Sequence, residues 1–285
     1  MASKYKTPTI EQLLDAGVHF GHQVKRWHPN MEPYIYTVKR NIHIIDLEQT
    51  ERLLKEACEF LYETAKKGGK IVFIGTKKQA RDIVGIEAKR AGAMYIMERW
   101  LGGIITNLAV IKKNNIDKLL ELKRKKEKGE LAKYTKKERL LIDREIERLE
   151  RFVGGITMMT AAPDVLFAVD AKREKTAIRE AKKAKIPVVA LLDTNSDPTE
   201  IDYVIPGNDD AIKSIAIIVK AIADAVEQGY ADYAKSTKEK EIAAQAEAEK
   251  SLDAVTVTSS EAPAKTEDLL DQEKEEVKAP KKGKK

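Results

Sequence analysis

The sequence predicts an α/β fold, in which helices cover both faces of a parallel sheet and a helical hairpin is inserted. Short and wholly apolar stretches, such as "IVFI" and "VVALL", alternate with amphipathic helical stretches. Strands buried on both faces carry such continuous apolar runs, and right-handed crossovers place helices on both faces. A stretch without any strand pattern lies between Asn107 and Gly154. We therefore expect a three-layer αβα domain, Rossmann-like or flavodoxin-like, with an inserted antiparallel coiled-coil hairpin.

The N-terminal region predicts a short helix, a histidine-rich loop and a pair of strands. Thr9 followed by Gln12 forms a capping-box pattern, and Gly17 is typical of a helix end. Three of the four histidines lie in the loop that follows, "HFGHQVKRWHPN". Two β-rich runs on either side of residues 39–41 predict a hairpin. Residues 48–67 then form a helix with apolar side chains along one face.

The rest of the sheet domain alternates strands with helices. In chain order, the expected strands are "GGKIVFIG", "AMYIM", "DVLFAVD", "IPVVALLD" and "DYVI". The expected helices are "TKKQARDIVGIEAKRAG", "AKREKTAIREAKKAK" and the long "DDAIKSIAIIVKAIADAVEQGYADYAK". This alternation is typical of βαβ units, so we expect the sheet to be parallel.

The inserted segment predicts two helices, about 107–128 and 130–152, on either side of Gly129. Asn107 is expected as the N-cap of the first helix. Residues 112–151 hold fifteen Lys and Arg against nine Asp and Glu. A narrow apolar seam cannot bury enough surface to hold the hairpin alone, so we expect its flanks to be solvated or to lie against a partner. The seam is expected at Leu108, Ile111, Leu119, Leu122, Leu140, Leu141, Ile146, Leu149 and Phe152.

Charge is unevenly distributed along the 285 residues. The net charge is +6, but residues 237–285 hold ten Lys against twelve Asp and Glu, so the preceding part carries +8. A basic globular part is typical of proteins that bind polyanions, although excess Lys also serves solubility. The tail lacks aromatic residues and is expected to be disordered after a transiently helical start. The expected parts are 1–106 and 155–236 for the two halves of the α/β domain, 107–154 for the hairpin and 237–285 for the tail.

Cys58 is the only cysteine, so the chain forms no internal disulfide, which is typical of a reducing compartment. Its amphipathic helical context favours a small buried residue over a nucleophile. No apolar run approaches the ~18 residues of a membrane-spanning helix. The start, "MASKYKTPTIEQLL", lacks the apolar core of a signal peptide. We expect a cytoplasmic protein.

The turn after "IVFI" raises the question of nucleotide binding, because α/β folds bind phosphate at such turns. Only Gly75 lies in the turn, and neither a G-x-G-x-x-G nor a P-loop motif is present. Thr76 is expected to cap the next helix, whose start carries Lys77, Lys78 and Arg81. These cations favour contact with an RNA backbone. A nucleotide-binding α/β enzyme that uses the Gly75–Lys78 turn is the alternative, and a plain capped surface helix is another.

Two further segments combine cations with tryptophan. Lys25 and Arg26 adjoin Trp27, a pattern typical of RNA-binding surfaces. Arg99 and Trp100 precede two glycines, which permit close backbone approach and stacking on a base. The alternative at Trp100 is a core tryptophan that closes a loop.

Carboxylates gather in the loops after the last two strands. Asp193 ends one strand, and Asp197 precedes a proline. Asp209 and Asp210 precede the long helix, where Asp210 can be the N-cap. Such residues usually form turns and caps, but together with a histidine they can also bind Zn²⁺.

The pair of histidines in "HFGH" raises a further alternative, a zinc hydrolase built on His19 and His22. The pattern lacks the helix-borne general-base glutamate of an H-E-x-x-H motif. No serine or cysteine lies in a recognisable nucleophile setting such as G-x-S-x-G. Both observations argue against hydrolytic chemistry.

Four ordered segments resemble the bacterial small-subunit ribosomal protein S-two family. They are "LLDAGVHFGHQVKRWHPNMEPYIYTVKRNIHIIDL", "FIGTKKQA", "ERWLGGIITN" and "PDVLFAVDAKREKTAIREAKKAKIPVVALLDTNSDPTEIDYVIPGNDDAI". The resemblance covers residues 5–232 and excludes the tail. It implies a three-layer α/β domain with an inserted coiled-coil hairpin. It also implies a structural, non-enzymatic role in translation.

The resemblance further implies partners and sites. The partners are small-subunit rRNA near the head–body junction and ribosomal protein S-one, and neither a membrane nor DNA is expected. The family also associates this docking surface with a metal, for which His19, Asp193 and Asp209 match; zinc is the candidate, and no other cofactor is required. Because the cations are scattered, we expect recognition of phosphates and RNA shape. The expected RNA contacts are Lys25, Arg26, Trp27, Lys39, Arg40, Lys77, Lys78, Arg81, Arg99, Trp100, Lys112, Lys113, Arg124, Lys125, Lys136, Lys137 and Arg144.

Overall fold

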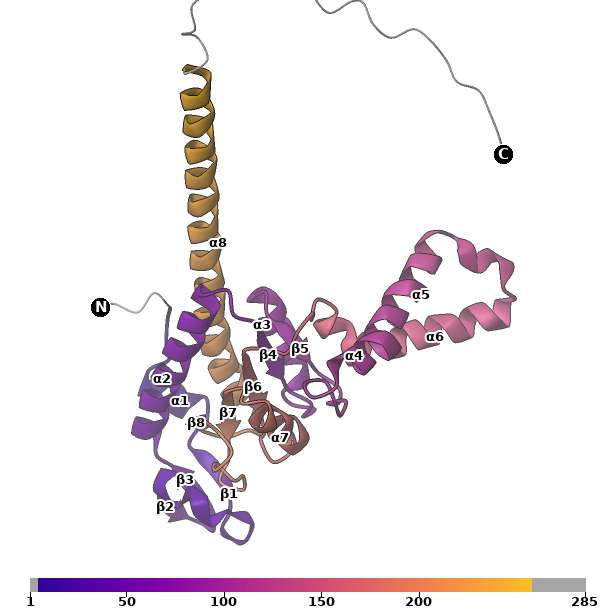
Figure 1. Ribbon diagram of the computed structural model, residues 1–285. Coiled ribbons are helices and arrows are strands. Elements are labelled where there is room, and N and C mark those ends of the chain that lie inside the picture. Colours follow the sequence, from indigo (N-terminus) through magenta and orange to yellow (C-terminus); the bar gives the residue numbers. More distant parts are fainter. Residues whose placement is uncertain (1–4, 258–285) are drawn as a thin grey trace, which may run out of the picture. The chain divides into compact units, whose positions relative to one another are not determined.

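A computed structural model describes residues 5–257 of the chain, and the side chains of residues 5–238 (Figure 1). Its centre is a five-stranded sheet in which every neighbouring pair of strands is parallel. The strand order β5-β4-β6-β7-β8 corresponds to 2-1-3-4-5 within this sheet, the flavodoxin-like arrangement. The order reverses between β4 and β6, where folds of this kind place ligands. The strands are β4 Ile71–Ile74, β5 Met94–Ile96, β6 Val165–Val169, β7 Val188–Leu192 and β8 Tyr203–Pro206.

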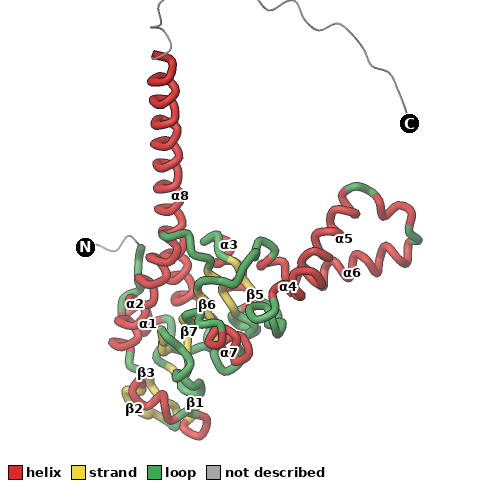
Figure 2. The backbone as a smooth tube through the Cα atoms, in the orientation of Figure 1, coloured by secondary structure: helices red, strands yellow, loops and turns green. Residues whose placement is uncertain are grey.

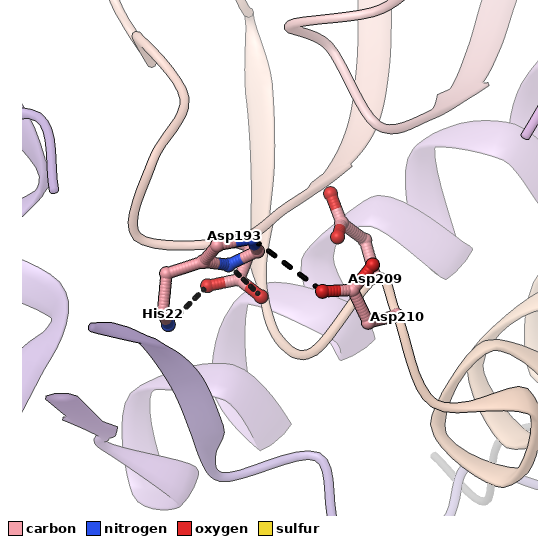
Figure 3. A group of neighbouring side chains, drawn as sticks. All are labelled: His22, Asp193, Asp209 and Asp210. Atoms are coloured by element: carbon pink, nitrogen blue, oxygen red, sulfur yellow. Dashed lines mark hydrogen bonds and ion pairs between the residues drawn. The ribbon is translucent and has the colours of Figure 1, made fainter. Parts of the chain in front are cut away.

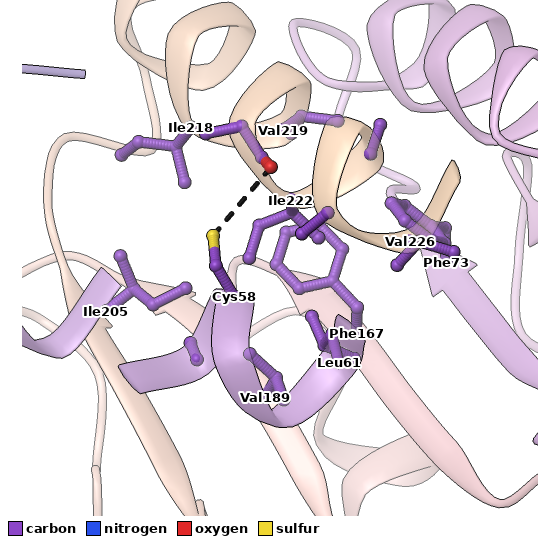
Figure 4. Close-up of a cluster of buried hydrophobic side chains, with 14 of the residues drawn as sticks. Cys58, Leu61, Phe73, Phe167, Val189, Ile205, Ile218, Val219, Ile222 and Val226 are labelled. Atoms are coloured by element: carbon purple, nitrogen blue, oxygen red, sulfur yellow. Dashed lines mark hydrogen bonds between the residues drawn. The ribbon is translucent and has the colours of Figure 1, made fainter. Parts of the chain in front are cut away.

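Each face of this sheet packs against its own hydrophobic cluster, which confirms the predicted three layers. One face carries Phe73 and Phe167, whose rings meet edge to face with centroids 5.1 Å apart. It is covered by α2 (Leu47–Lys66), α3 (Arg81–Arg90) and the first part of α8 (Ile212–Val257), as Figures 1 and 4 show. Burial of such side chains contributes about 1.5–3 kcal/mol each.

The opposite face carries the alternate strand residues, such as Val72 and Leu166. It is covered by α7 (Lys175–Lys183) and by the base of the inserted hairpin. Because strand side chains alternate between the faces, a fully apolar strand serves both clusters at once. This explains why the strand sequences show continuous rather than alternating apolar residues.

Cys58 lies in the first cluster, with its thiol directed to the carbonyl oxygen of Ala221 at 3.7 Å (Figure 4). Burial raises the pKa of this thiol, so it stays protonated. The predicted role of Cys58 as a buried packing residue is therefore confirmed.

The N-terminal segment forms a helix and a small antiparallel sheet of order β1-β3-β2. Thr9 and Gln12 form the predicted capping box at the start of α1. The turn between β2 and β3 holds two residues with positive φ, a hairpin geometry that favours residues such as Asn. Part of the predicted loop is instead strand β1. The elements are α1 Ile10–Asp15, β1 Phe20–Gln23, 3₁₀ segments Val24–Arg26 and Pro29–Tyr34, β2 Ile35–Lys39 and β3 Ile42–Ile45.

The inserted hairpin is present, with Gly129 in the left-handed region at the bend (φ 70°). Its second helix begins six residues later than predicted, because residues 130–133 form a 3₁₀ turn and Thr135 then makes a capping box with Glu138. Asn107 stands at the N-cap position but makes no capping hydrogen bond. The elements are α4 Leu108–Ile111, a π-helical turn Lys112–Asp117, α5 Lys118–Glu127, 3₁₀ Glu130–Lys133, α6 Lys136–Val153 and 3₁₀ Gly154–Ile156.

The apolar seam of the hairpin is shorter than predicted. Leu119 and Leu149 are buried against the sheet-face cluster, whereas Leu140 and Leu141 are 51% and 54% exposed. Toward the bend, contact between the helices includes an ion pair of Lys126 with Asp143 at 2.7 Å. The predicted seam is therefore wrong at Leu140 and Leu141, because the helices diverge toward the bend, as Figure 2 shows.

The chain divides into two units, residues 1–236 and 237–285. Helix α8 continues through this boundary to Val257, so the part of the tail that was expected to have a transiently helical start is helical in the structure. The rest of the tail prediction, 258–285, lies outside the described residues.

Candidate nucleic-acid interface and metal centre

The loops at the carboxyl edge of the sheet enclose a lysine among carboxylates. The Lys77 ammonium lies 2.6 Å from Asp209 Oδ1, 2.5 Å from Asp210 Oδ1 and 3.6 Å from Asp170 Oδ2. Lys77 is only 9% exposed and comes from the loop after β4, while Asp170 follows β6. This cluster therefore fills the crevice at the point where the strand order reverses. The charge of Lys77 is balanced within the protein.

The turn after β4 does not start a helix, since α3 begins only at Arg81. Thr76 is not the predicted cap: its backbone N–H donates to Glu174 Oε1 at 3.2 Å, and its hydroxyl bonds to the same carboxylate. Burial raises the pKa of Glu174. Gly75 is required by packing, because a Cβ there would lie 2.6 Å from Val84 Cγ2. The backbone N–H groups of Gly75 and Thr76 thus have acceptors within the protein, which argues against a phosphate cradle at these two residues.

A group of metal-ligand type lies beside Lys77 (Figure 3). One donor atom from each of His22, Asp193, Asp209 and Asp210 lies within 4.8 Å of the others. His22 Nδ1 lies 2.9 Å from Asp193 Oδ2, and its Nε2 lies 3.4 Å from Asp210 Oδ2. The hydrogen bond to Asp193 raises the pKa of His22. Asp210, expected as a helix cap, instead holds Lys77 and His22.

The donor set fits a divalent cation. Asp209 is 1% exposed, and its Oδ2 is buried without a hydrogen-bond partner. Burial, together with the carboxylates of Asp170 and Asp193, raises the pKa of Asp209, so a further positive charge would be favourable here. One imidazole and three carboxylates are ligands that Zn²⁺ accepts. A cation at this place would share Asp209 and Asp210 with Lys77.

The structure groups the predicted aspartates with His22 and not with His19. The His19 ring packs on Phe20 with centroids 3.9 Å apart, and its Nδ1 is buried without a partner. Among the described residues, His19 belongs to no group of potential metal ligands. His22 lies on strand β1, where its backbone N–H donates to Asp193 Oδ1 and fixes it against that loop, whereas His19 precedes the strand.

Most of the predicted RNA contacts lie at the surface. The half-buried exceptions carry ion pairs: Arg81 with Glu98 at 3.0 Å and Lys125 with Glu121. Lys77 is buried among three carboxylates, Trp27 is half-buried and Trp100 is buried. The remaining predicted contacts are cations that are exposed and make no ion pair with any side chain of residues 5–238. They are Lys25, Arg26, Lys39, Arg40, Lys78, Arg99, Lys112, Lys113, Arg124, Lys136, Lys137 and Arg144.

Trp100 is a core residue, 7% exposed, which corrects the prediction of a stacking surface. Its indole N–H donates to Glu180 on α7 at 3.1 Å. The same carboxylate accepts the backbone N–H groups of Gly103, Ile105 and Thr106. Burial alone would raise the pKa of Glu180, but these donors lower it overall. One carboxylate therefore holds the whole loop from which the hairpin departs.

Sequence reasoning missed a group of cations around the start of α7. Lys172, Lys175 and Arg179 are exposed and make no ion pair with another side chain in the described part of the chain. They lie near Arg26 and Trp27, which come from a distant part of the sequence. In "AKREKTAIREAKKAK" cations outnumber acids, a signal for a basic surface, although its periodicity alone predicts only a helix.

The comparisons with known proteins agree on one family. Residues 13–229 match the family model described as ribosomal protein S2. A protein of Sorangium cellulosum named small ribosomal subunit protein uS2 is 50% identical over 220 residues, which are 77% of this chain and 79% of that relative. Within the described residues, no helix is both long and apolar enough to span a membrane. The chain therefore belongs to the ribosomal protein S2 family, whose members are structural proteins of the small ribosomal subunit and not enzymes.

Proposed function

We propose that this chain binds small-subunit rRNA near the head–body junction of the cytoplasmic ribosome and helps to dock ribosomal protein S1. The family match supports the small subunit as the assembly. The observation that carries the rRNA contact is the set of exposed cations without ion pairs, because only such charges are free to neutralise phosphates. They lie in the N-terminal segment, in the loops after β4 and β5, and on the hairpin.

Recognition takes place mainly through the phosphate backbone. The described residues contain a scattered set of Lys and Arg and no compact module that presents several aromatics to bases. Phosphate contacts of this kind position a protein on folded RNA and make its affinity strongly dependent on salt. The exposed Leu140 and Leu141 on the hairpin are covered when the hairpin lies against its partner.

Sedimentation of the tagged full-length chain from a bacterial lysate tests this function. We expect the chain to sediment with small subunits at low salt and to leave them at high salt. A variant in which Lys112, Lys113, Lys136 and Lys137 are changed to Ser is expected to shift toward the unbound fractions. Sedimentation away from small subunits at every salt concentration would contradict the proposal.

A divalent cation, with zinc as the candidate, is part of the proposal for S1 docking. The ligands are His22, Asp193, Asp209 and Asp210, and the metal would fix the N-terminal sheet to the loops after β7 and β8. That sheet exposes Phe20, Tyr36 and Val38, so apolar side chains available to a protein partner lie on the same part of the chain.

Metal analysis of the dialysed protein tests whether His19 or His22 is the zinc ligand. We expect one zinc per chain in the wild type and in His19→Ala, and loss of zinc in His22→Ala and Asp193→Asn. Retention of S1 by the immobilised chain is then measured with and without a chelator. Zinc that stays bound in His22→Ala would contradict the proposed ligands. An equal amount of S1 retained with and without the chelator would contradict the role of the metal.

A further inference from the structure

A cavity of about 470 Å³ lies between the N-terminal segment and the start of α7. Its lining comes from three segments: residues 26–28, part of the stretch from Ala171 to Arg179, and part of the stretch from Asn195 to Ile201. Its volume lies within the range of sites that bind small molecules, so it has room for a single planar group.

The cavity lining holds more cations than carboxylates, and its Lys and Arg side chains form no ion pair within residues 5–238. Arg26, Lys172, Lys175 and Arg179 all line it, and none forms an ion pair with a side chain of residues 5–238. This differs from Lys77, which has three carboxylate neighbours. Four unbalanced cations around one cavity favour an anion, and Arg and Lys are the residues that hold phosphates.

The interior of the cavity combines an aromatic wall with an apolar floor. Trp27 is half-buried, and its ring is supported by His43 with centroids 5.3 Å apart. Ile178 and Ile201 contribute buried aliphatic side chains to the lining. A flat hydrophobic group that stacks on an indole fits these surroundings, and nucleic-acid bases have such a face.

Two acidic residues complete the lining. Asp197 and Glu200 stand among its polar groups. Asp197 already accepts hydrogen bonds from Asn30 and Thr199, which lower its pKa, so it is charged. These carboxylates repel an acidic peptide within the cavity, but they accept hydrogen bonds from the amino group of a base.

From these observations we propose that the cavity binds one unpaired nucleotide of RNA, with its phosphate among the four cations and its base against Trp27. The inference rests on the proposed rRNA binding and adds to it a site that captures a base, beside the backbone contacts. Proteins read single-stranded RNA by stacking splayed bases on aromatic side chains in this way.

The test uses the full-length chain and adenosine monophosphate, with tryptophan fluorescence as the readout. We expect saturable quenching of Trp27 and no saturable signal in Trp27→Phe, because the remaining Trp100 is buried. Arg179→Ala is expected to weaken binding about tenfold, while Lys183→Ala, an exposed cation on the same helix outside the cavity, leaves it unchanged. Inorganic phosphate and a polyglutamate peptide are expected to compete poorly.

A second measurement separates this site from the proposed function. Trp27→Ala is expected to lower the affinity of the chain for small-subunit rRNA about tenfold, with recovery in Trp27→Phe. If the wild type binds rRNA but adenosine monophosphate leaves Trp27 unquenched, the nucleotide site is overturned and the rRNA proposal stands. Equal competition by phosphate, or tighter binding of the peptide, would also overturn it. If the chain binds no rRNA at all, the proposed function itself fails.

Discussion

Lys77 and Arg179 lie in two regions of the same sheet domain. The two regions differ in whether their cations are paired with carboxylates of the same chain. At the carboxyl edge of the sheet, Lys77 is buried against three carboxylates. Around α7, Arg179 and its neighbours are exposed and lack carboxylate partners among residues 5–238. A buried lysine that is paired internally compensates carboxylates that would otherwise be buried without a counter-charge, whereas unbalanced surface charge is available to a polyanion. The difference separates structural cations from binding cations within one basic protein.

Two cations that are adjacent in the sequence can differ in whether they are buried and paired or exposed and unpaired. Lys77 and Lys78 are adjacent, yet the first is buried and the second exposed. Asp209, which balances Lys77, lies 132 positions away. Only the folded chain brings these groups together, so a count of cations in a segment does not predict which of them can contact RNA.

The largest effect is expected for Lys77→Met. Removing the ammonium leaves buried carboxylates without a counter-charge, which costs about 3–5 kcal/mol of unfolding free energy. Lys78→Met is the matched control and is expected to change stability by less than about 0.5 kcal/mol. Urea unfolding of both variants measures the difference. Equal stability of the two variants would contradict the internal role of Lys77.

The hairpin offers the same kind of comparison for apolar residues. Leu119→Ala removes a fully buried side chain at the hairpin base and is expected to cost about 3 kcal/mol. Leu140→Ala removes a side chain that is half exposed and is expected to have little effect on the free chain. Thermal unfolding checks both. A large loss for Leu140→Ala would show that the seam extends to the bend.

Glu180→Gln tests the loop at the hairpin base and is expected to cost about 2 kcal/mol at neutral pH. The pKa of Glu180 is lowered in the folded chain, so its carboxylate stabilises the fold above the unfolded pKa. That contribution is lost as the pH falls through the lower, folded value. The stability difference between wild type and variant should therefore shrink below about pH 4. A difference that is independent of pH would contradict this account.

Much of the fold was predictable from local patterns. Thr9 and Gln12 predict a capping box from a stretch of four residues. The five apolar strands predict a sheet that is covered by helices on both faces. The errors arise where one residue has two possible roles. Thr76 stands where a helix cap is expected. Its backbone N–H and hydroxyl instead donate hydrogen bonds to the carboxylate of Glu174, which is distant in the sequence. Asp210 likewise faces Lys77 instead of its own helix.

The site was predictable in composition and less so in geometry. The family resemblance and the absence of an enzymatic role are confirmed by the family match. The aspartate loops meet a histidine as expected, but it is His22, which lies on β1 and donates its backbone N–H to Asp193, whereas His19 precedes the strand and packs on Phe20. The roles of these residues, and of the predicted RNA contacts, stay predictions. Trp100 is the clearest example of what the sequence does not predict. An Arg–Trp pair has the same sequence whether the tryptophan is buried in a core or exposed on an RNA-binding surface.

The smallest expected effect gives the most direct test of the division between balanced and unbalanced cations. It is the slope of log K against log salt for binding of small-subunit rRNA. Arg179→Ala removes an unbalanced cation and should flatten the slope by about one. Arg90→Ala changes the net charge equally, but Arg90 is paired with Glu87, Asp224 and Glu227, so its slope should equal that of the wild type. An equal decrease of this slope in both variants, or an affinity that does not depend on the salt concentration, would contradict the account.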